Sequence, residues 1–565
     1  METLYEYAQR PDIIDVIVRY NRRLMKFAKE NQYLMLGKVY SEGWVIAYLP
    51  GDKLGDFLSA MNLGQVSVVP KIMTLMGRES LVASGILQLQ QRPHMDLRGR
   101  GVLLGFIDTG IDYTKDAFIY EDGTSKIKYI WDQTIQTAPV ENGVIFGTAY
   151  DQSELSGALR SESPFDIVPH RDTVGHGTFL ASVAGSREDS DYIGAAPDAE
   201  IIMVKLRKMR PFYTSRFRVP EGQENVFSSA DVILGIKYIV DKAEELDRPV
   251  SICISVGSTF GSHDSFGNIE NYLMRLAPLV GIAINVAAGN ESNARRHFEG
   301  LVKTGETTDF EVRVGPDMRH AVVYIWCMPQ DIMHLSVKSP GGEVVTSRSG
   351  LVDVYFSQRL ILENSVVHIN YHFPNEGSGN NLLVVNLDTP TPGIWTISVH
   401  GELILDGVFN AWMPATGISY PDVDFVSPSP YNTIVNPGTA LNVTTCGAYD
   451  RRNNSLMPGS SWGPSRFNIM LPDIVAPGVD VSGVYPWGYG TMSGTSVATA
   501  ITTGAAALML QWGIVNGNYP TLNNLRLRAF LMQGCTRDTD KTYPNNQWGY
   551  GRLDLMETFN VLRRL

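Results

Sequence analysis

The fold is decided by the stretch Gly490-Thr491-Met492-Ser493-Gly494-Thr495-Ser496-Val497-Ala498-Thr499-Ala500. A glycine-rich turn leads into a long run of small and apolar residues, which predicts a helix that begins close to Ser496. The first backbone N–H groups of a helix lack partners within it, and the helix dipole is positive at that end. A serine hydroxyl placed there can gather negative charge on an oxygen, as acyl transfer requires.

A serine hydroxyl alone is a weak nucleophile, so this interpretation requires a base and an acid that orients the base. Upstream, Asp108 ends the apolar run 101–107, which is typical of a parallel strand buried on both faces. Open α/β sheets place their sites at the carboxyl ends of such strands. His176 is flanked by glycines, which allow backbone and substrate to approach its ring. We predict that His176 takes the Ser496 proton and that Asp108 holds its tautomer.

Strands and helices alternate on both sides of this histidine. Buried strands are expected near residues 200–206, 250–257 and 281–288, with a helix over 229–245. This alternation predicts a doubly wound parallel sheet, the α/β class.

Residues 295–428 break the alternation. They contain short strand-like segments between Gly, Pro and Asn turns and no helical pattern, which predicts an inserted β-sandwich or jelly-roll domain. The α/β pattern resumes near residue 441, so residues 77–294 and 429–565 are expected to form one domain in two parts. Packing and partner recognition remain alternative roles for the insert.

Residues 1–76 form a small unit of their own. Strands are expected at 13–20, 39–49 and from 66 onward, and helices at 22–30 and 52–61. The order β-α-β-β-α-β, with the middle segment broken into two strands, is that of a ferredoxin-like α+β fold. A unit this short is marginal alone and is expected to dock on a larger one. A plain N-terminal cap is the alternative.

Composition excludes several partner classes. The 47 basic and 59 acidic side chains give a net charge of −12, which argues against nucleic acid or an anionic membrane as the main partner. The N-terminus has neither a basic nor an apolar leader segment, so we expect no signal peptide and synthesis in the cytoplasm. The uncharged run 497–515 approaches the length of a membrane span but is interpreted as a buried core helix.

The remaining polar chemistry is sparse. Four scattered cysteines without a C-x-x-C pair are expected to be reduced, buried thiols. No segment has the ligand spacing of a dedicated calcium loop, so no cofactor is expected. Calcium stays conceivable at Asp538-Thr539-Asp540, where a solvated turn is the preferred interpretation.

Five motifs together resemble the signatures of the subtilisin-like serine proteases, the subtilases. The order Asp, His, Ser is that of subtilisin, and the serine lies in G-T-S-V-A rather than the G-x-S-x-G of α/β hydrolases. The resemblance covers roughly residues 100–290 and 430–560 and implies a subtilisin-like sheet. The motifs are Asp108-Thr109-Gly110, His176-Gly177-Thr178, Gly194-Ala195-Ala196-Pro197, Ala288-Gly289-Asn290 and Gly494-Thr495-Ser496.

The resemblance implies a role for each catalytic position. Ser496 would be the nucleophile, His176 the general base and Asp108 its orienting acid. Asn290 would supply the side-chain donor of the oxyanion hole, beside the Ser496 backbone N–H. The activity implied is that of a serine endopeptidase.

The resemblance also implies where a protein substrate binds. The backbone of Ser255, Val256 and Gly257 resembles the edge that pairs with an extended substrate. The neighbouring segment Ala287, Ala288 and Gly289 would line one side of the pocket for the residue before the cut.

The finer resemblance is to the clostridial Csp germination proteases. They combine a short prodomain, no signal peptide and a jelly-roll insert between the oxyanion asparagine and the catalytic serine. Csp proteases activate the precursor of a spore-cortex lytic enzyme, which implies packaging in the spore. Residues 1–76 would then be an intramolecular chaperone cut in cis near Met76 to Ser80. The released segment would stay bound, with its C-terminal strand in the substrate cleft.

Two alternatives stay open within this family. A pseudoprotease would bind without cutting and would have a damaged site, whereas Asp108, His176, Ser496 and Asn290 are all present. A general intracellular subtilase would digest an unfolded generic protein rather than clip one substrate.

Overall fold

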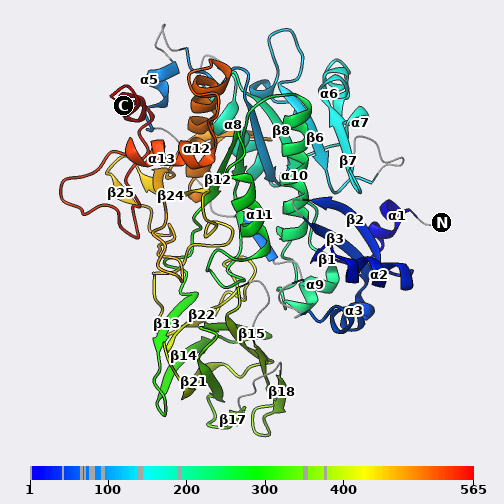
Figure 1. The fold of residues 1–565 in the computed structure, drawn as a ribbon, viewed down its shortest axis with the longest axis vertical. Helices are drawn as coiled ribbons and strands as arrows, with labels where there is room; N and C mark the ends of the chain where they lie inside the picture. The colour runs from blue at the N-terminus through cyan, green and yellow to red at the C-terminus, as the bar shows by residue number, and fades with distance from the viewer. Residues whose placement is uncertain are drawn as a thin grey trace.

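A computed structural model describes residues 3–40, 43–63, 68, 72–75, 83–90, 96–136, 144–188, 192–347, 354–373 and 378–564. Figure 1 shows a large α/β part, a β-rich part beside it and a small unit at the N-terminal end of the chain.

The α/β part is built on a nine-stranded sheet of order β25-β24-β12-β10-β5-β8-β6-β7, with β26 paired to β24. The strands β26, β24, β12, β10, β5, β8 and β6 pair parallel with one another, as predicted. The end strands β25 and β7 pair antiparallel with β24 and β6. The strands are β5 (Leu103–Asp108), β6 (Ile127–Asp132), β7 (Thr148–Asp151), β8 (Glu200–Lys205), β10 (Val250–Ile254), β12 (Ile282–Ala287), β24 (Thr444–Asp450), β25 (Ser455–Leu456) and β26 (Ile474–Pro477).

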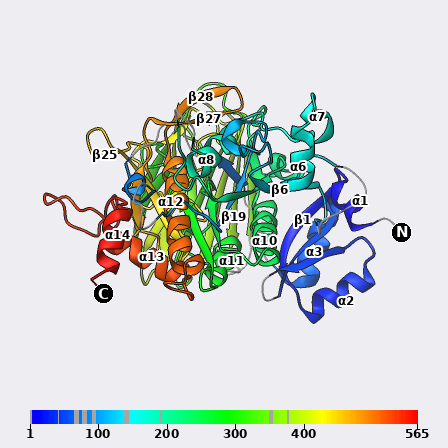
Figure 2. The ribbon, with the colours of Figure 1, turned by 90° about the horizontal axis from the view of Figure 1, so that it is seen from above.

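Helices cover both faces of this sheet (Figure 2). Leu104 and Phe106 of β5 join the apolar core that contains residues of α8 (His176–Gly185) and α12 (Thr495–Leu510). Their neighbours Leu103 and Ile107 join the opposite core, with α10 (Ser229–Glu245) and α11 (Asn268–Leu276). Because strand side chains alternate between faces, a strand covered on both sides must be apolar throughout.

Helix α12 confirms the interpretation of the long uncharged run. One described helix, Thr495–Val515, has the length and apolar character of a membrane span, and 89% of the span-length window lies buried inside the fold. Its last turn, Gln511–Val515, is π-helical. Cys253, Cys327, Cys446 and Cys535 are buried free thiols, also as predicted.

The N-terminal unit contains a three-stranded antiparallel sheet of order β1-β3-β2. A strand was expected from residue 66 onward, but Val68 is helical, and residues 66, 67, 69 and 70 lie outside the described part. The next strand, β4 (Ile72–Leu75), pairs with β9 (Val226–Ser228) and β11 (Val256–Gly257) of the α/β part. The other elements are α1 (Leu4–Gln9), β1 (Ile13–Arg19), α2 (Arg22–Glu30), β2 (Met35–Tyr40), β3 (Trp44–Pro50) and α3 (Leu54–Met61).

Both faces of this small sheet are covered. Ile13 and Tyr48 lie in the apolar core that contains residues of α10 and α11, and the rings of Tyr40 and Tyr272 meet edge to face at 5.5 Å. Ile14, on the opposite face, joins residues of α2 and α3 in a separate core. The unit therefore docks through side chains that alternate along its strands.

The β-rich part consists of two antiparallel sheets, of order β13-β22-β15-β20-β19-β18 and β17-β16-β21-β14-β23. Phe310, Trp395, Val323 and Ile369, from strands of both sheets, share one buried core, so the sheets pack face to face. The strands are β13 (His297–Leu301), β14 (Thr307–Val314), β15 (His320–Cys327), β16 (Ile332–Lys338), β17 (Val344–Thr346), β18 (Val354–Arg359), β19 (Val366–His372), β20 (Asn381–Asp388), β21 (Gly393–Leu403), β22 (Val408–Trp412) and β23 (Val423–Phe425).

The remaining elements connect or border the α/β part. The hairpin of β27 (Val481–Tyr485) and β28 (Gly488–Met492) leads directly into α12. The helices are α5 (Ile86–Gln90), α6 (Gln152–Leu159), α7 (Pro164–Ile167), α9 (Pro211–Arg216), α13 (Asn524–Gln533) and α14 (Leu555–Leu562).

Candidate active site

The structure pairs Asp108 with His176. Asp108 is the last residue of β5 and His176 the first of α8. The His176 Nδ1 atom lies 2.8 Å from Oδ1 and 2.9 Å from Oδ2 of Asp108. The Thr109 N–H donates to the same carboxylate at 2.8 Å, and the Ser255 hydroxyl donates to its Oδ2 atom. Both members of the pair are buried.

The environment of Asp108 defines the histidine tautomer. Burial alone would raise the pKa of Asp108, but the His176 ring, the Ser255 hydroxyl and the Thr109 N–H hold it below its usual value. An ionised carboxylate only accepts, so Nδ1 of His176 carries the proton and Nε2 keeps a lone pair. This Nε2 is buried and has no hydrogen-bond partner among the residues the structure describes. The imidazole is therefore arranged as a base.

Ser496 lies in the same cluster. It is the second residue of α12, at the positive end of the helix dipole, and the N-cap residue, Gly494, has no side chain to cap the helix. The Ser496 hydroxyl donates to the Ser255 carbonyl at 3.4 Å, and the Ser255 hydroxyl in turn donates to Asp108. Hydrogen bonds thus link the predicted serine, acid and base through Ser255.

Asn290 presents an amide donor beside the start of α12. Its Oδ1 accepts from the Thr495 N–H at 3.1 Å and lies 3.3 Å from the Thr495 hydroxyl. The Nδ2 atom is buried without a partner among the described residues. The Thr495 hydroxyl also accepts from the Gly289 N–H at 3.1 Å. Thr495 therefore orients the amide, a role that the sequence analysis missed although the residue lies within the G-T-S motif.

The turn before His176 is held by a residue that the sequence analysis also missed. The Asp172 carboxylate accepts from the Gly175 N–H at 2.8 Å and from the Thr178 N–H and hydroxyl at 2.9 and 2.7 Å. Its position four residues before the histidine was the available signal. A Cβ at Gly177 would lie 2.2 Å from the Gly110 carbonyl, so glycine is required there, as predicted.

A second buried Asp–His pair supports the loop after Asp108. The His170 Nδ1 atom lies 2.6 Å from Oδ2 of Asp132, and both side chains are inaccessible to solvent. The Ile111 N–H donates to His170 Nε2 at 3.2 Å. Burial would raise the pKa of Asp132, but the His170 ring and the Lys205 ammonium lower it to about 2. No sequence motif marks either residue.

Strand β4 lies along the predicted substrate edge. In the antiparallel register Leu75 faces Val256 and Thr74 faces Gly257. On its other side β4 pairs with β9, so it fills the gap between two edges. The predicted cut, at residues 76–80, lies outside the described residues.

The segment Ala287–Ala288–Gly289 lies at the end of β12 and packs against Val435. Ala288 donates to the Cys446 carbonyl at 2.9 Å and accepts from the Val435 N–H at 3.0 Å. A Cβ at Gly289 would lie 2.7 Å from Val435. The wall is therefore rigid and made of small residues.

The acidic stretch near residue 538 forms ion pairs with basic side chains of the same chain. The Asp538 carboxylate accepts from Lys541 at 2.9 Å and from Arg552 at 2.7 Å. Within the described part of the chain, no group of three or more His, Cys, Asp or Glu side chains is placed to hold a metal ion.

Comparison with solved structures finds a similarity that extends over most of both chains. The CspB protease of Clostridium perfringens is 30% identical, with a TM-score of 0.75, and the match covers 85% of this chain and 97% of that one.

Curated relatives match over shorter segments. The subtilase-type proteinase RRT12 of Saccharomyces cerevisiae is 38% identical over 82 residues, which are 14% of this chain and 16% of that protein. The serine protease AprX of Bacillus subtilis is 38% identical over 143 residues, 22% of this chain and 30% of that protein. The chain thus spans less than a third of the length of these two relatives.

The model of the subtilase family matches residues 99–312 and 426–551. The gap between these segments falls inside the two-sheet part, and the matched segments hold Asp108, His176, Asn290 and Ser496. The chain belongs to the subtilase family of serine proteases.

Proposed function

We propose that this chain is a serine endopeptidase that hydrolyses peptide bonds through an acyl-enzyme, with Ser496, His176 and Asp108 as its triad. The observation that carries the proposal is the hydrogen-bonded chain from Ser496 through Ser255 to Asp108 and His176. Nucleophile, base and orienting acid in one buried cluster are what acyl transfer needs.

The first step forms the acyl-enzyme. The Ser496 oxygen attacks the substrate carbonyl carbon while Nε2 of His176 takes the hydroxyl proton. The ionised Asp108 holds the Nδ1 proton and offsets the imidazolium charge. As the C–N bond breaks, His176 returns the proton to the leaving amine. Water then attacks the ester by the same route, and Ser496 recovers its proton.

The oxyanion formed in each step lies at the start of α12. The Nδ2 donor of Asn290 and the Ser496 backbone N–H are assigned to it. The amide needs no reorientation, because Thr495 already occupies its oxygen. Removing one such donor from a serine protease costs about 3–4 kcal/mol of transition-state stabilisation.

Residues 1–76 act in this proposal as an intramolecular chaperone and inhibitor that is cut in cis near residues 76–80. The pairing of β4 with β11 supports this role, because Val256 and Gly257 are the edge assigned to extended substrates. Leu75, the last described residue of β4, faces Val256, one residue from the Ser255 carbonyl that binds Ser496. The chain therefore leaves β4 beside the nucleophile.

The proposed substrate is the precursor of a spore-cortex lytic enzyme, which this protease would activate by limited cleavage during germination, inside the spore. Two observations support a Csp-type role: the similarity to CspB over 97% of that chain, and the two-sheet insert between Asn290 and Ser496, which fits a jelly roll. The three-stranded sheet with α2 and α3 fits most of a ferredoxin-like prodomain.

Mass spectrometry of the purified chain tests the catalytic proposal. We expect two fragments separated between residues 76 and 80 from the wild type, and one intact chain from Ser496→Ala. If both proteins stay intact under the same conditions, the chain is a pseudoprotease that binds without cutting. Digestion of an unfolded generic protein, rather than one clip in a lytic-enzyme precursor, would instead indicate a general intracellular subtilase.

A further inference from the structure

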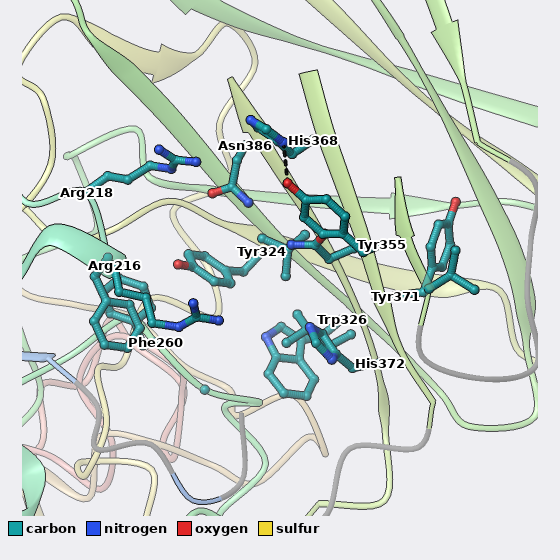
Figure 3. A pocket seen from close by; sticks show the side chains of 16 residues that line it. Arg216, Arg218, Phe260, Tyr324, Trp326, Tyr355, His368, Tyr371, His372 and Asn386 are labelled. Atoms are coloured by element: carbon teal, nitrogen blue, oxygen red, sulfur yellow. Dashed lines mark hydrogen bonds between the residues drawn. The ribbon is translucent and has the colours of Figure 1, made fainter. Parts of the chain in front are cut away.

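A cavity of about 440 Å³ lies where the insert meets the α/β part (Figure 3). One wall comes from β15, β18, β19 and β20 of the six-stranded sheet, and the other from the end of α9 and the loop after β11. Its volume falls within the range of small-ligand and side-chain pockets.

Two residues that line the cavity, Trp326 and Asn370, have buried polar atoms without a partner among the described residues. These are the Nε1 donor of Trp326, whose side chain is 2% exposed, and the Oδ1 acceptor of Asn370. Both atoms are shielded from solvent, so a ligand in the cavity would contact the rings and the charged groups of the lining instead.

The cavity lining also carries two arginines. Among the described residues it includes Arg216, Arg218, His368 and His372 and no carboxylate. Arg218 and His368 both pair with Asp388, outside the lining, at 2.7 and 3.0 Å. Figure 3 shows the Arg216 guanidinium reaching past Phe260 towards the other wall. Aromatic walls with cationic groups favour a ligand that is both apolar and acidic.

The cavity continues the line of the substrate edge. Phe260 lies three residues beyond Gly257, the last residue of β11, and so within at most about 10 Å of it along the chain. Because β4 runs antiparallel to β11, residues that precede a bound strand head in this direction. Val68 shows that chain upstream of β4 reaches this region, since it shares a core cluster with Phe260.

We propose that this cavity is a distal subsite for the substrate, which takes an acidic and apolar segment several residues before the cut. The inference rests on the proposed protease function, because it identifies the edge of β11 as the substrate edge. The subsite would make cleavage depend on sequence far from the scissile bond and so limit it to few proteins.

The test uses fluorescence anisotropy of a labelled hexapeptide of alternating glutamate and leucine with the full-length chain. We expect saturable binding that Arg216→Gln weakens about tenfold, as loss of a charge-assisted hydrogen bond does. The same hexapeptide with glutamine in place of glutamate should bind the wild type about as weakly as the glutamate peptide binds Arg216→Gln. Arg319→Gln, an arginine with 66% exposure outside the lining, is the control and should bind like the wild type.

Ser496→Ala separates the two proposals, because the subsite requires no catalysis. Equal peptide binding by Ser496→Ala and the wild type would support the subsite even if neither protein cuts itself. The subsite would be overturned if the wild type did not bind the peptide. It would also be overturned if neither Arg216→Gln nor the replacement of glutamate by glutamine in the peptide weakened binding. Neither result would affect self-cleavage. Binding of free glutarate without binding of the peptide would assign the cavity to a small anion and overturn it too.

Discussion

Asp108 and His176, the acid and base of the proposed mechanism, are held by groups that take no part in its bond breaking. Ser255 and Thr109 donate to the acid, Asp172 holds the turn before the base, and Thr495 orients Asn290. Each hydrogen bond fixes a side chain before substrate arrives, so little reorganisation is needed in the transition state.

Asn290→Ala tests the oxyanion assignment. We expect kcat to fall by about 10²–10³ with little change in KM, because the donor acts where charge develops and not on the ground state. Peptide hydrolysis and the rate of self-cleavage both measure it. Asn293→Ala removes an exposed asparagine three residues later and should match the wild type. Equal activities of the two variants would exclude Asn290 from this role.

Asp132→Asn tests the second buried pair through pH. The pKa of Asp132 is about 2 in the folded chain, against 3.8 normally, so its charge stabilises the fold above pH 4. That stabilisation, about 2 kcal/mol, is lost as the pH falls from 4 through 2. Urea unfolding should therefore show the variant less stable at pH 7 and equal to the wild type near pH 2. Asp540→Asn, with 76% exposure, is the control. A difference between variant and wild type that does not change with pH would contradict this account.

Helix α12 depends on small residues for its position. It packs against both α8 and the sheet, and a Cβ at Gly504 would lie 2.3 Å from the Ala195 Cβ. The Ala-rich and Gly-rich sequence after Ser496 is thus a requirement of close packing as well as of helix formation.

Gly504→Ala measures that requirement. Alanine favours a helix over glycine by up to about 1 kcal/mol, but overpacking costs about 1–3 kcal/mol, so we expect a lower midpoint of thermal unfolding. Gly55→Ala in α3 is the matched comparison, since no atom lies within 4 Å of the added Cβ. That change should raise the midpoint. A rise in both variants would show that α12 has room to move.

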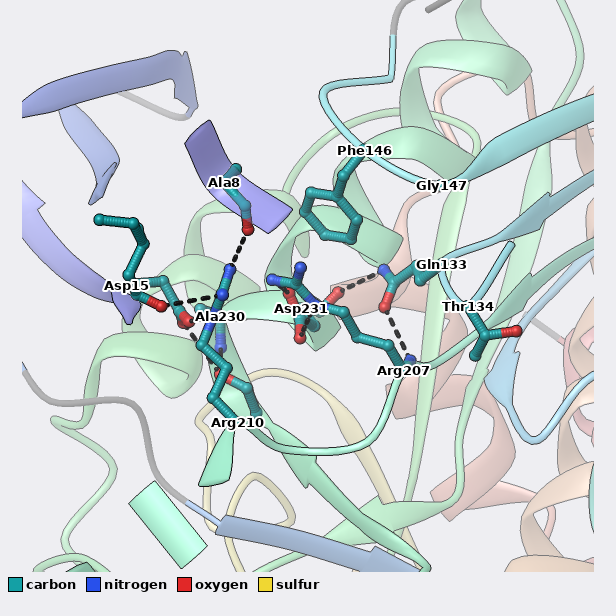
Figure 4. A network of polar contacts seen from close by, with 12 residues as sticks. Ala8, Asp15, Gln133, Thr134, Phe146, Gly147, Arg207, Arg210, Ala230 and Asp231 are labelled. Atoms are coloured by element: carbon teal, nitrogen blue, oxygen red, sulfur yellow. Dashed lines mark hydrogen bonds and ion pairs between the residues drawn. The ribbon is translucent and has the colours of Figure 1, made fainter. Parts of the chain in front are cut away.

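At the scale of the whole molecule, buried charged side chains join the N-terminal unit to the α/β part (Figure 4). Arg210, before α9, lies 2.8 Å from Oδ1 of Asp15 in β1 and donates to the Ile13 carbonyl at 2.9 Å. Its guanidinium also donates to the Ala8 carbonyl, and the Ser228 hydroxyl donates to Asp15 at 3.2 Å. With the Arg10 carbonyl, at 3.3 Å, this one arginine binds four backbone or side-chain acceptors of the unit.

Arg210→Met should loosen this assembly. Methionine keeps the length of the side chain but leaves Asp15 buried and unpaired, at a cost of about 3–5 kcal/mol. After self-cleavage we expect residues 1–76 to co-elute with the remainder in wild type and to separate from it in the variant on gel filtration. Arg10→Gln removes an exposed pair with Asp12, worth at most about 1 kcal/mol, and should keep the fragment. Retention in both variants would show that apolar contacts suffice.

The sequence alone was enough to predict the sheet, the insert and the four candidate catalytic positions. Those features leave local signals: an apolar run before Asp108, glycines around His176 and the G-T-S turn before α12. Side chains whose partners lie far away in the sequence leave no local signal, and so His170, Asp132 and Arg210 were missed. The expected strand from residue 66 shows the same limit. β4 begins at Ile72 and pairs with β9 and β11. The partners of a strand depend on which strand edges the fold brings close to it, and the local sequence does not show this.

Residue identity and order thus specified the chemistry: a hydroxyl, an imidazole, a carboxylate and an amide donor, each in a backbone setting that its neighbours dictate. The three-dimensional arrangement specified what surrounds those residues, namely the strand β4 paired with β11, the buried ion pair that joins the N-terminal unit to the α/β part, and the arginine-lined cavity beside the insert. These features arise from contacts between segments hundreds of residues apart. Their energies depend on burial and distance, which no local pattern encodes.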